Sequence, residues 1–351
     1  MLVFQSKVTV YNAAGDAAFV FPYSSSITIE TSRNTFTDTA TVTIPNKLRQ
    51  GNSKRIQDVV KVGNRITIQM RYVPSMFGDV SLKNWNTNVE FDGYVSKVNP
   101  DAPMVIYCED EMFQLKRKSL APKYFSKVSF SEIMEYLAPG YEKVVQDANI
   151  GEFKTEGSVT PVDAFDALRK NFNTYIYFRG KVLYCEILPQ TIDANRTIEL
   201  NVNRNVPIGG DELTYKDEAD TRTVVYVYSK NTETGQDISR YYAYKDNTEG
   251  SEIIVSTKPL PGNVNKFKSP NLTAANADVL GKRYLQNLWY TGVEGTIETF
   301  GEPSIIHGDA AKVVNLRVNE RDGIYRVASV TKTFTTTEGY RQIVQLSKKI
   351  N

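Results

Sequence analysis

Period-two alternation of apolar and polar residues constrains this chain more than any other feature of its sequence. Segments such as SKVTVYN, SSITIETS and DTATVTIPN, within the first 46 residues, place every second side chain on one face. That pattern is typical of half-buried β-strands, and Pro45 stands where the third strand should end. Alternating segments continue to about residue 110 and return from 201 to 351. The sequence therefore predicts a mainly β protein.

Between these two β-rich zones the pattern changes to helical spacing. Ser129 and Glu132 form a capping-box pair before the segment IMEYLAPG, which predicts a helix start. Thr160 and Pro161 predict the N-cap and first position of a second helix. The segment TYIYFRGKVLYCEIL predicts a hairpin that turns at Arg-Gly. We therefore expect a small α+β domain over residues 111–200.

One helix is expected inside the second β-rich zone, over about residues 272–290. Its buried face is predicted by apolar residues at helical spacing, namely Ala277, Leu280, Tyr284 and Leu288. The segments RTVVYVYSK and ISRYYAYKD flank a Thr-Gly turn at residues 234 and 235, which predicts a second hairpin.

Three segments of the first zone recur in the same order in the second zone. SITIETSRNTFTDTATVTIP corresponds to DELTYKDEADTRTVVYVYS, VGNRITIQMRY to HGDAAKVVNLRV, and FDGYVSKV to RDGIYRVASV. In the last pair an Asp-Gly turn precedes each alternating run. Residue identities are few, and strand-rich chains produce chance echoes, but the shared order favours an internal duplication. The loops between the segments differ, which would give the two copies different contact surfaces.

The charge balance and apolar content indicate which partners to expect. The chain has 42 basic and 40 acidic residues, a net charge of +2, whereas nucleic-acid binders usually carry a clustered basic excess. We therefore expect no nucleic-acid sequence recognition. No apolar run approaches the roughly 18 residues of a membrane span, and the N-terminus lacks the pattern of a signal peptide, so we expect no membrane insertion.

The residues that could take part in catalysis or metal binding are better explained by structural roles. We therefore expect no catalytic residue, metal or cofactor. His307 is the single histidine, so His-His metal sites are excluded, and we favour a structural or surface role for it. Glu109, Asp110 and Glu111 could act as paired acids on a glycan; acids at a helix N-terminus are the favoured interpretation. Cys108 and Cys185 lie in apolar strand-like runs and are expected as buried free thiols of a protein made in a reducing cytoplasm.

Several longer segments occur in an order that matches a known group of proteins. They are TATVTIPN, VGNRITIQM, FDGYVSKV, IYCEDEMFQLKRK, SFSEIMEYLAPG, DAFDALRKNFNTYIYFRGKVLYCEIL and GDAAKVVNLRVNERDGIYRVASVTKTFTTTEGYRQIVQL. On these segments the chain resembles the baseplate hub proteins of contractile phage tails, the late control protein D family, and the N-terminal region of VgrG proteins of type VI secretion. The resemblance covers essentially the whole chain.

This resemblance implies a mainly β fold with an α+β insert. Two similar antiparallel β-barrel domains, residues 1–110 and 201–351, would flank the α+β domain of residues 111–200. Three chains would form a ring of six barrels. The chain would be a structural hub and no enzyme, and the homotrimer would adapt the hexameric tail tube to a trimeric spike.

The same resemblance implies the partners and the location. The partners would be further copies of the chain, the tail tube protein, a spike protein and other baseplate proteins. VgrG proteins continue into an OB-like domain and a β-helical spike, whereas this sequence stops after the second copy, so a separate spike protein is expected. The hub would lie in the virion tail or baseplate of a phage, a prophage or a related contractile injection system, and would assemble in the bacterial host cytoplasm.

Two other hypotheses stay open at the level of the sequence. The chain could be the hub of a non-contractile tail or of a secretion machine. Alternatively, it could be a glycan-binding or glycan-acting β protein, for which the 21 Tyr and 2 Trp residues and the acidic cluster are the only support.

Under the hub hypothesis we expect interface residues in place of an active site. Strand edges in two segments are expected to pair between neighbouring barrels, namely Thr41, Val42, Thr43 and Ile44, and Thr296, Ile297, Glu298 and Thr299. Met76, Phe77 and Trp85 lie in a loop over residues 74–88. This loop either contacts a neighbouring subunit or the tube, since exposed apolar surface often marks an interface, or folds over its own barrel.

Overall fold

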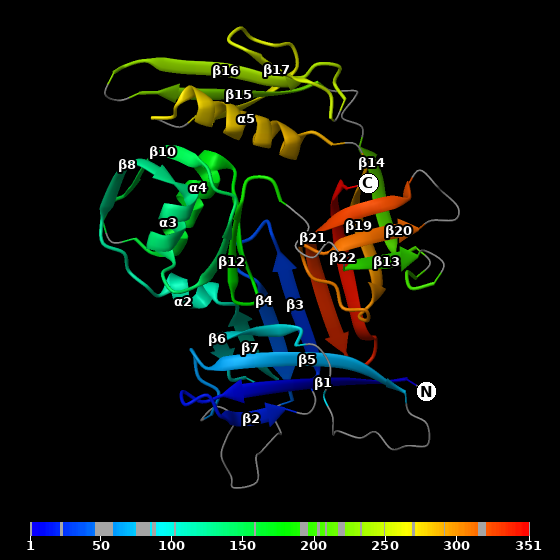
Figure 1. The fold of residues 1–351 in the computed structure, drawn as a ribbon. Coiled ribbons are helices and arrows are strands. Elements are labelled where there is room, and N and C mark those ends of the chain that lie inside the picture. The colour runs from blue at the N-terminus through cyan, green and yellow to red at the C-terminus, as the bar shows by residue number, and fades with distance from the viewer. Residues whose placement is uncertain are drawn as a thin grey trace. The chain divides into compact units, whose positions relative to one another are not determined.

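The computed structural model describes most of the chain and confirms a mainly β protein with antiparallel sheets (Figure 1). The described residues are 2–21, 24–45, 59–74, 85, 89–101, 103–157, 159–189, 196–201, 204–207, 209–216, 222–231, 234–248, 250–268, 271–290, 292–314 and 321–350.

The chain forms two compact units. Unit 1 consists of Met1–Phe113, Ile192–Leu213 and Gly295–Ser347, and unit 2 consists of Gln114–Thr191, Thr214–Glu294 and Lys348–Asn351. The three-domain division predicted from the sequence, with boundaries at about residues 110 and 200, remains a proposal.

The first β half of unit 1 is a curled antiparallel sheet. Its strands are β1 (Leu2–Tyr11), β2 (Ala17–Phe21), β3 (Ser26–Ser32), β4 (Thr39–Ile44), β5 (Arg65–Pro74), β6 (Phe91–Asn99) and β7 (Met104–Glu109). Their order in the sheet is β3-β4-β7-β6-β5-β1-β2. In Figure 1, β1, β2 and β5 cross beneath β3 and β4, so the sheet encloses one core.

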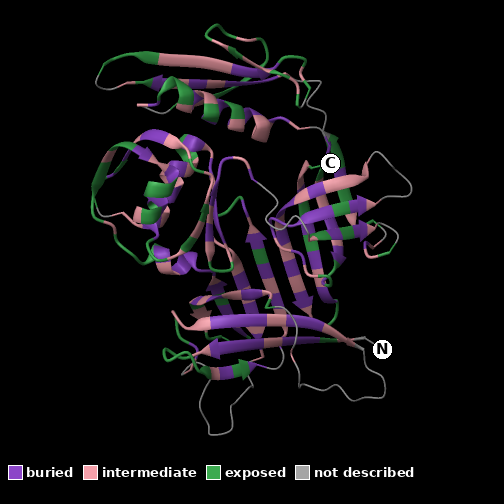
Figure 2. Ribbon diagram, in the orientation of Figure 1, coloured by how far each residue is buried: buried purple, intermediate pink, exposed green. Residues whose placement is uncertain are grey.

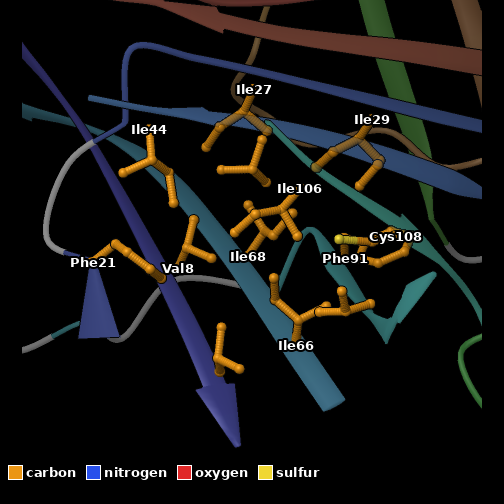
Figure 3. Close-up of a cluster of buried hydrophobic side chains, with 14 of the residues drawn as sticks. Val8, Phe21, Ile27, Ile29, Ile44, Ile66, Ile68, Phe91, Ile106 and Cys108 are labelled. Atoms are coloured by element: carbon orange, nitrogen blue, oxygen red, sulfur yellow. The ribbon is translucent and has the colours of Figure 1, made fainter. Parts of the chain in front are cut away.

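The core of this half follows directly from the period-two alternation. In β4, for example, Ala40, Val42 and Ile44 are buried while the threonines between them are half-buried, and Figure 2 shows similar alternating bands along neighbouring strands. All seven strands contribute side chains to one cluster, including Val8, Phe21, Ile27, Ile44, Ile66, Ile68, Phe91, Ile106 and Cys108 (Figure 3). Each fully buried side chain of this size stabilises the fold by about 1.5–3 kcal/mol.

The second β half of unit 1 repeats the strand order of the first. Its strands are β13 (Thr197–Asn201), β14 (Asp211–Lys216), β19 (Gly292–Phe300), β20 (Ala310–Val314), β21 (Gly323–Thr335) and β22 (Gly339–Lys349). Their order is β14-β19-β22-β21-β20-β13, which matches β3-β4-β7-β6-β5-β1 position by position. One difference is that β1 pairs with β5 in the antiparallel sense, whereas β13 pairs with β20 in the parallel sense.

This repeated order confirms the similarity of the two β halves and corrects one detail of the sequence alignment. β20 is the counterpart of β5 and β21 of β6, as the segment matches predicted. The predicted counterpart of β4, the segment TRTVVYVYS, is instead β15 (Thr223–Lys230) in a different sheet, and β19 occupies the position of β4. The prediction failed there because an insertion separates β14 from β19, and its first strand has the same alternation as the true partner.

Unit 2 contains the α+β elements that follow the first β half, except that the first two residues of α2 belong to unit 1. They are α2 (Met112–Lys116), β8 (Lys123–Ser129), α3 (Phe130–Leu137), β9 (Glu142–Val145), β10 (Asn149–Thr155), α4 (Pro161–Phe172), β11 (Tyr175–Arg179) and β12 (Val182–Glu186). Ser129 with Glu132 and Thr160 with Asp163 form capping boxes at the starts of α3 and α4. The predicted hairpin is β11–β12.

The inserted part of unit 2 is a four-stranded sheet with a helix packed against it. β15 lies between β16 (Asp237–Tyr244) and β18 (Asn263–Lys268), and β17 (Ile253–Ser256) flanks β16. The predicted helix is α5 (Ala274–Leu288), with Thr273 as its N-cap. Of its four predicted inward residues, Ala277, Leu280 and Tyr284 are buried, whereas Leu288 in the last turn is half-buried.

The two cysteines and the helices can be compared with the predictions of free thiols and of no membrane insertion. Cys108 and Cys185 are buried and free, and burial raises the pKa of both thiols. Within the described part of the chain, no helix is both long and apolar enough to cross a membrane.

Candidate assembly interface

The two β halves of unit 1 are joined by pairing of a strand from each. β21 of the second half pairs with β3 of the first in the antiparallel sense, from Ser329 opposite Ser32 to Thr335 opposite Ser26. The amide of Arg33 adds a hydrogen bond to the carbonyl of Ala328 at 3.1 Å. Since both halves also have the same strand order, unit 1 presents two similar β units in one continuous sheet.

A buried ion pair lies across this joint. The Nζ of Lys332 on β21 donates to a carboxylate oxygen of Glu90, which precedes β6, and to Oγ of Ser304 at 2.7 Å. Ser304 Oγ in turn donates to Glu90 at 2.7 Å. The side chains of Lys332 and Glu90 are only 1% and 4% exposed. Such a pair contributes little net stability, but it disfavours arrangements that would separate the two charges.

His307 has a structural position at the same joint. Its ring is 1% exposed, and its Nε2 lies 3.2 Å from Oδ2 of Asp38, which belongs to the connection between β3 and β4. Asp38 also accepts a hydrogen bond from the amide of Ser32 at 2.9 Å. The buried contact therefore supports the favoured structural role of this histidine.

An aromatic contact completes the joint. The hydroxyl of Tyr72 on β5 donates to the carbonyl of Tyr340 on β22 and accepts a hydrogen bond from the amide of Gly301 at 2.9 Å. The two tyrosine rings stack with centroids 5.8 Å apart. Side chains of the first half therefore bind backbone groups of the second.

The acidic cluster at residues 109–111 includes the capping group of a helix. Oδ1 of Asp110 accepts a hydrogen bond from the amide of Met112, the first residue of α2, at 3.0 Å, and its Oδ2 accepts one from the amide of Asp38 at 3.2 Å. This geometry agrees with the helix-terminus interpretation of the cluster. Among the described residues, no group of three or more His, Cys, Asp or Glu side chains is placed to hold a metal ion.

The first segment proposed as an interface edge lies inside a sheet. Thr41–Ile44 belong to β4, which pairs with β3 on one side and β7 on the other. Val42 and Ile44 point into the core, while Thr41 and Thr43 are half-buried. The backbone edge of this segment is already occupied, so any contact with another subunit would use the two threonine side chains.

The second proposed edge segment has the equivalent position in the other half. Thr296–Thr299 belong to β19, whose residues pair with β22, and the amide of Glu298 donates to the carbonyl of Gly210 beside β14. Ile297 and Thr299 are buried, whereas Thr296 and Glu298 are half-buried on the outer face. As in β4, only outward side chains remain for a partner.

The third proposed contact can be followed at one residue only. Met76 and Phe77 lie outside the described residues. The indole of Trp85 lies beside its own chain, with the guanidinium carbon of Arg71 4.1 Å and the Nζ of Lys7 5.9 Å from the ring centroid. These cation–π contacts place the side chain of Trp85 against its own β half.

Sequence reasoning missed the joint between β3 and β21. The available signal was the length of β21, since its alternation continues through Thr335 whereas that of β6 ends before Pro100. Because β21 is longer than its counterpart β6, its additional backbone groups need another hydrogen-bonding partner. That partner is β3.

Solved structures with the same fold include tail proteins and a PdpA-VgrG complex. The tail protein from Neisseria meningitidis MC58 matches with a TM-score of 0.62 and 10% identity, over 98% of this chain and 96% of that chain. The 43 kDa tail protein of prophage MuSo2 from Shewanella oneidensis matches with a TM-score of 0.56 and 12% identity, over 99% and 98%. A chain of the Francisella PdpA-VgrG complex matches with a TM-score of 0.54 and 10% identity, over 99% of this chain and 58% of that chain.

Comparison by sequence gave no such match, since neither a family model nor a curated protein matches the chain. At identities near 10%, the likeness to solved structures establishes the fold. The chain has the fold shared by these phage tail proteins and the PdpA-VgrG complex, in agreement with its resemblance to baseplate hub and VgrG proteins.

Proposed function

We propose that the chain is a structural hub of a phage or prophage tail or of a related contractile injection system. Three copies form a ring of six similar β units, and the ring adapts a hexameric tail tube to a trimeric spike. The observation that carries this proposal is the strand order that occurs twice within unit 1. The full-length match to two tail proteins supports it.

The symmetry of such a ring gives the duplication a physical purpose. A homotrimer has three-fold symmetry, whereas a tube of hexameric rings has six-fold symmetry. With two similar β units in each of its three chains, the ring offers six nearly equivalent positions to the tube. The differences between the two β units leave a three-fold surface for the spike. One gene product can therefore contact both assemblies.

A fixed angle between the two β units is a requirement of this role, because six positions must lie in register. Two features would resist rotation of one β half of unit 1 against the other. They are the strand pairing of β3 with β21 and the buried ion pair of Lys332 and Glu90. A buried ion pair favours one arrangement over others even where it adds little stability.

The proposed partners are further copies of this chain, the tail tube protein, a separate spike protein and other baseplate proteins. The outward side chains Thr41, Thr43, Thr296 and Glu298 remain candidates for these contacts. The proposed location is the virion tail or baseplate, with assembly in the host cytoplasm. The role is one of assembly, without catalysis.

The oligomeric state tests this proposal. Light scattering of the purified chain over a range of concentrations should give a mass of three times 39.6 kDa at the highest concentrations. A chain that stays monomeric at every concentration would overturn the proposed ring of three copies.

Among the residues that the structure describes, no observation favours the glycan alternative. Its acidic cluster includes Asp110, which is occupied as a helix cap, and Glu111, which lies within 3.3 Å of the hydroxyl of Tyr94. We therefore retain the assembly role alone.

A further inference from the structure

An aromatic pocket of about 380 Å³ opens on unit 1. Its apolar walls are Phe4, Tyr72 and Phe300, and its polar rim is formed by Glu302, Glu338 and Arg341. Phe4 and Phe300 remain 37% and 40% exposed. Large apolar side chains that stay exposed around a concave surface are typical of a protein-binding site.

The walls of the pocket are held in place by contacts within unit 1. The rings of Phe4 and Tyr72 meet edge to face with centroids 5.4 Å apart, and the guanidinium of Arg341 lies 4.5 Å from the ring centroid of Phe300. Gly339 has φ +78°, and a Cβ there would come within 2.7 Å of the Phe4 ring. The pocket therefore needs little rearrangement to receive a side chain, which lowers the entropic cost of binding.

The charges on the rim of the pocket favour a positively charged binding partner. Glu302 and Glu338 are both exposed, and within the described residues neither forms an ion pair. Arg341 supplies one positive charge against these two carboxylates. A partner that fits would present an aromatic or aliphatic side chain with a cation beside it.

The first β half of the same unit carries such a feature on its outer face. Tyr107 on β7 is 38% exposed, and the Nζ of Lys97 on β6 lies 5.7 Å from its ring centroid. A register shift between Val95 and Lys97 places Lys97 directly opposite Tyr107, so both side chains point outward together. A tyrosine is a typical interface anchor because it has a large apolar ring and few rotamers to restrict.

We propose that the Phe4–Phe300 pocket of one copy receives Tyr107 of a neighbouring copy, with Lys97 placed against Glu338 on the rim. This inference rests on the ring proposed above. The contact joins two different surfaces of the same chain, and such head-to-tail contacts close into rings when the rotation allows. It forms one part of the larger interface that a stable trimer needs.

A second exposed aromatic residue beside a lysine fits the pocket less well. Tyr124 on β8 is 59% exposed. Its neighbour Lys123 lies 4.6 Å and 4.8 Å from the ring centroids of Phe125 and Tyr136, so its ammonium is already engaged within unit 2. Tyr124 and Lys123 therefore provide matched controls.

Charge reversal tests the proposed contact. Lys97→Glu and Glu338→Lys should each raise the apparent dissociation constant of the trimer about 10-fold, and the double variant should restore it, because the two charges would again be opposite. Tyr107→Ala should weaken the trimer about 10-fold or more. Tyr124→Ala and Lys123→Glu should leave it unchanged. Sedimentation velocity over a range of concentrations measures each constant, and circular dichroism checks that each variant is folded.

The outcomes separate this contact from the ring itself. If the wild-type chain trimerises and all variants trimerise as tightly, this contact is wrong while the hub stands. If the single reversals weaken the trimer but the double variant does not recover, Lys97 does not face Glu338 and the proposal is wrong. A wild-type chain that is monomeric at every concentration would remove both the ring and the contact.

Discussion

Lys332 is a single residue on which the geometry of the joint between the two β halves depends. Its ammonium is enclosed with Glu90 and Ser304, and it stands on the strand that pairs with the other half. Removing one member of such a pair leaves an uncompensated buried charge, which is more costly than never having buried the pair.

We expect Lys332→Met to lower the free energy of unfolding of unit 1 by about 3–5 kcal/mol. The double variant with Glu90→Leu should lose less than the sum of the two single changes, because no lone charge remains. Urea unfolding in a Trp289→Phe background measures this, since Trp85 then reports on unit 1. Lys312→Met, an exposed lysine on β20, is the control, and an unchanged midpoint for Lys332→Met would contradict the role of the pair.

Asp278 on α5 makes a pH-dependent contribution to the stability of unit 2. Partial burial acts to raise the pKa of this carboxyl, but hydrogen bonds from Arg240 and Tyr242 outweigh it and hold the pKa below its usual value. A carboxyl with a lowered pKa in the folded state stabilises the protein above its unfolded pKa, and the contribution is lost as the pH falls through the folded pKa.

Asp278→Asn should therefore cost about 1 kcal/mol near pH 7, at the low end for a charged hydrogen bond because the side chain is partly exposed. The difference from wild type should shrink as the pH falls from about 4 toward 2. Thermal unfolding in a Trp85→Phe background, followed by Trp289 fluorescence, measures both. Glu252→Gln, at an exposed ion pair, is the control, and a difference that is constant from pH 7 to 2 would exclude this linkage.

At the scale of elements, the helices of unit 2 begin where short polar motifs indicate. The side chain of Thr160 accepts a hydrogen bond from the amide of Asp163, and the side chain of Asp163 accepts one from the amide of Thr160 at 2.8 Å. The backbone hydrogen bond from Thr160 is the main reason that the pKa of Asp163 is lowered. Since these contacts lie within four residues, local sequence is enough to predict them.

Thr160→Ala should lower the stability of unit 2 by about 1 kcal/mol, because it removes the side-chain acceptor at the first turn of α4. Thr160→Ser should retain most of that stability. Chemical unfolding in a Trp85→Phe background, monitored through Trp289 in unit 2, compares the three proteins. Equal stabilities for the alanine and wild-type chains would mean that the cap contributes nothing.

The sequence predicted individual strands better than it predicted their partners. The alternation of apolar and polar residues predicts which face of β4 is buried. It does not indicate whether β3, β7 or a strand of another chain pairs with β4. For this reason Thr41–Ile44 and Thr296–Thr299 were predicted as open edges, although β4 and β19 are interior strands. The partner of β21 lies about 300 residues earlier in the chain, and no local pattern specifies such a contact.

The Asp-Gly pair of the first duplicated segment has a different role from the predicted turn. Asp92 and Gly93 lie within β6, where Asp92 binds Arg65 on the neighbouring strand. A Cβ at Gly93 would come within 2.3 Å of the carbonyl oxygen of Glu109. The glycine is needed for close approach of two strands, a reason that sequence alone does not distinguish from a turn.

At the scale of the whole molecule, the proposed hub depends on how three copies of the chain are arranged. The strand order occurs twice in unit 1, and the candidate site is a set of surfaces. Composition and the resemblance to hub proteins predicted the fold, and the full-length matches to tail proteins agree. The contact surfaces could not be predicted in the same way, because they depend on which outward side chains remain after the sheet has formed.

Electron cryomicroscopy of the purified chain at high concentration, reconstructed without imposed symmetry, tests whether the proposed ring forms. We predict a closed ring of three chains in which six similar β units alternate around a channel. A reconstruction that contains single chains, or an assembly whose β units do not repeat around one axis, would contradict the account.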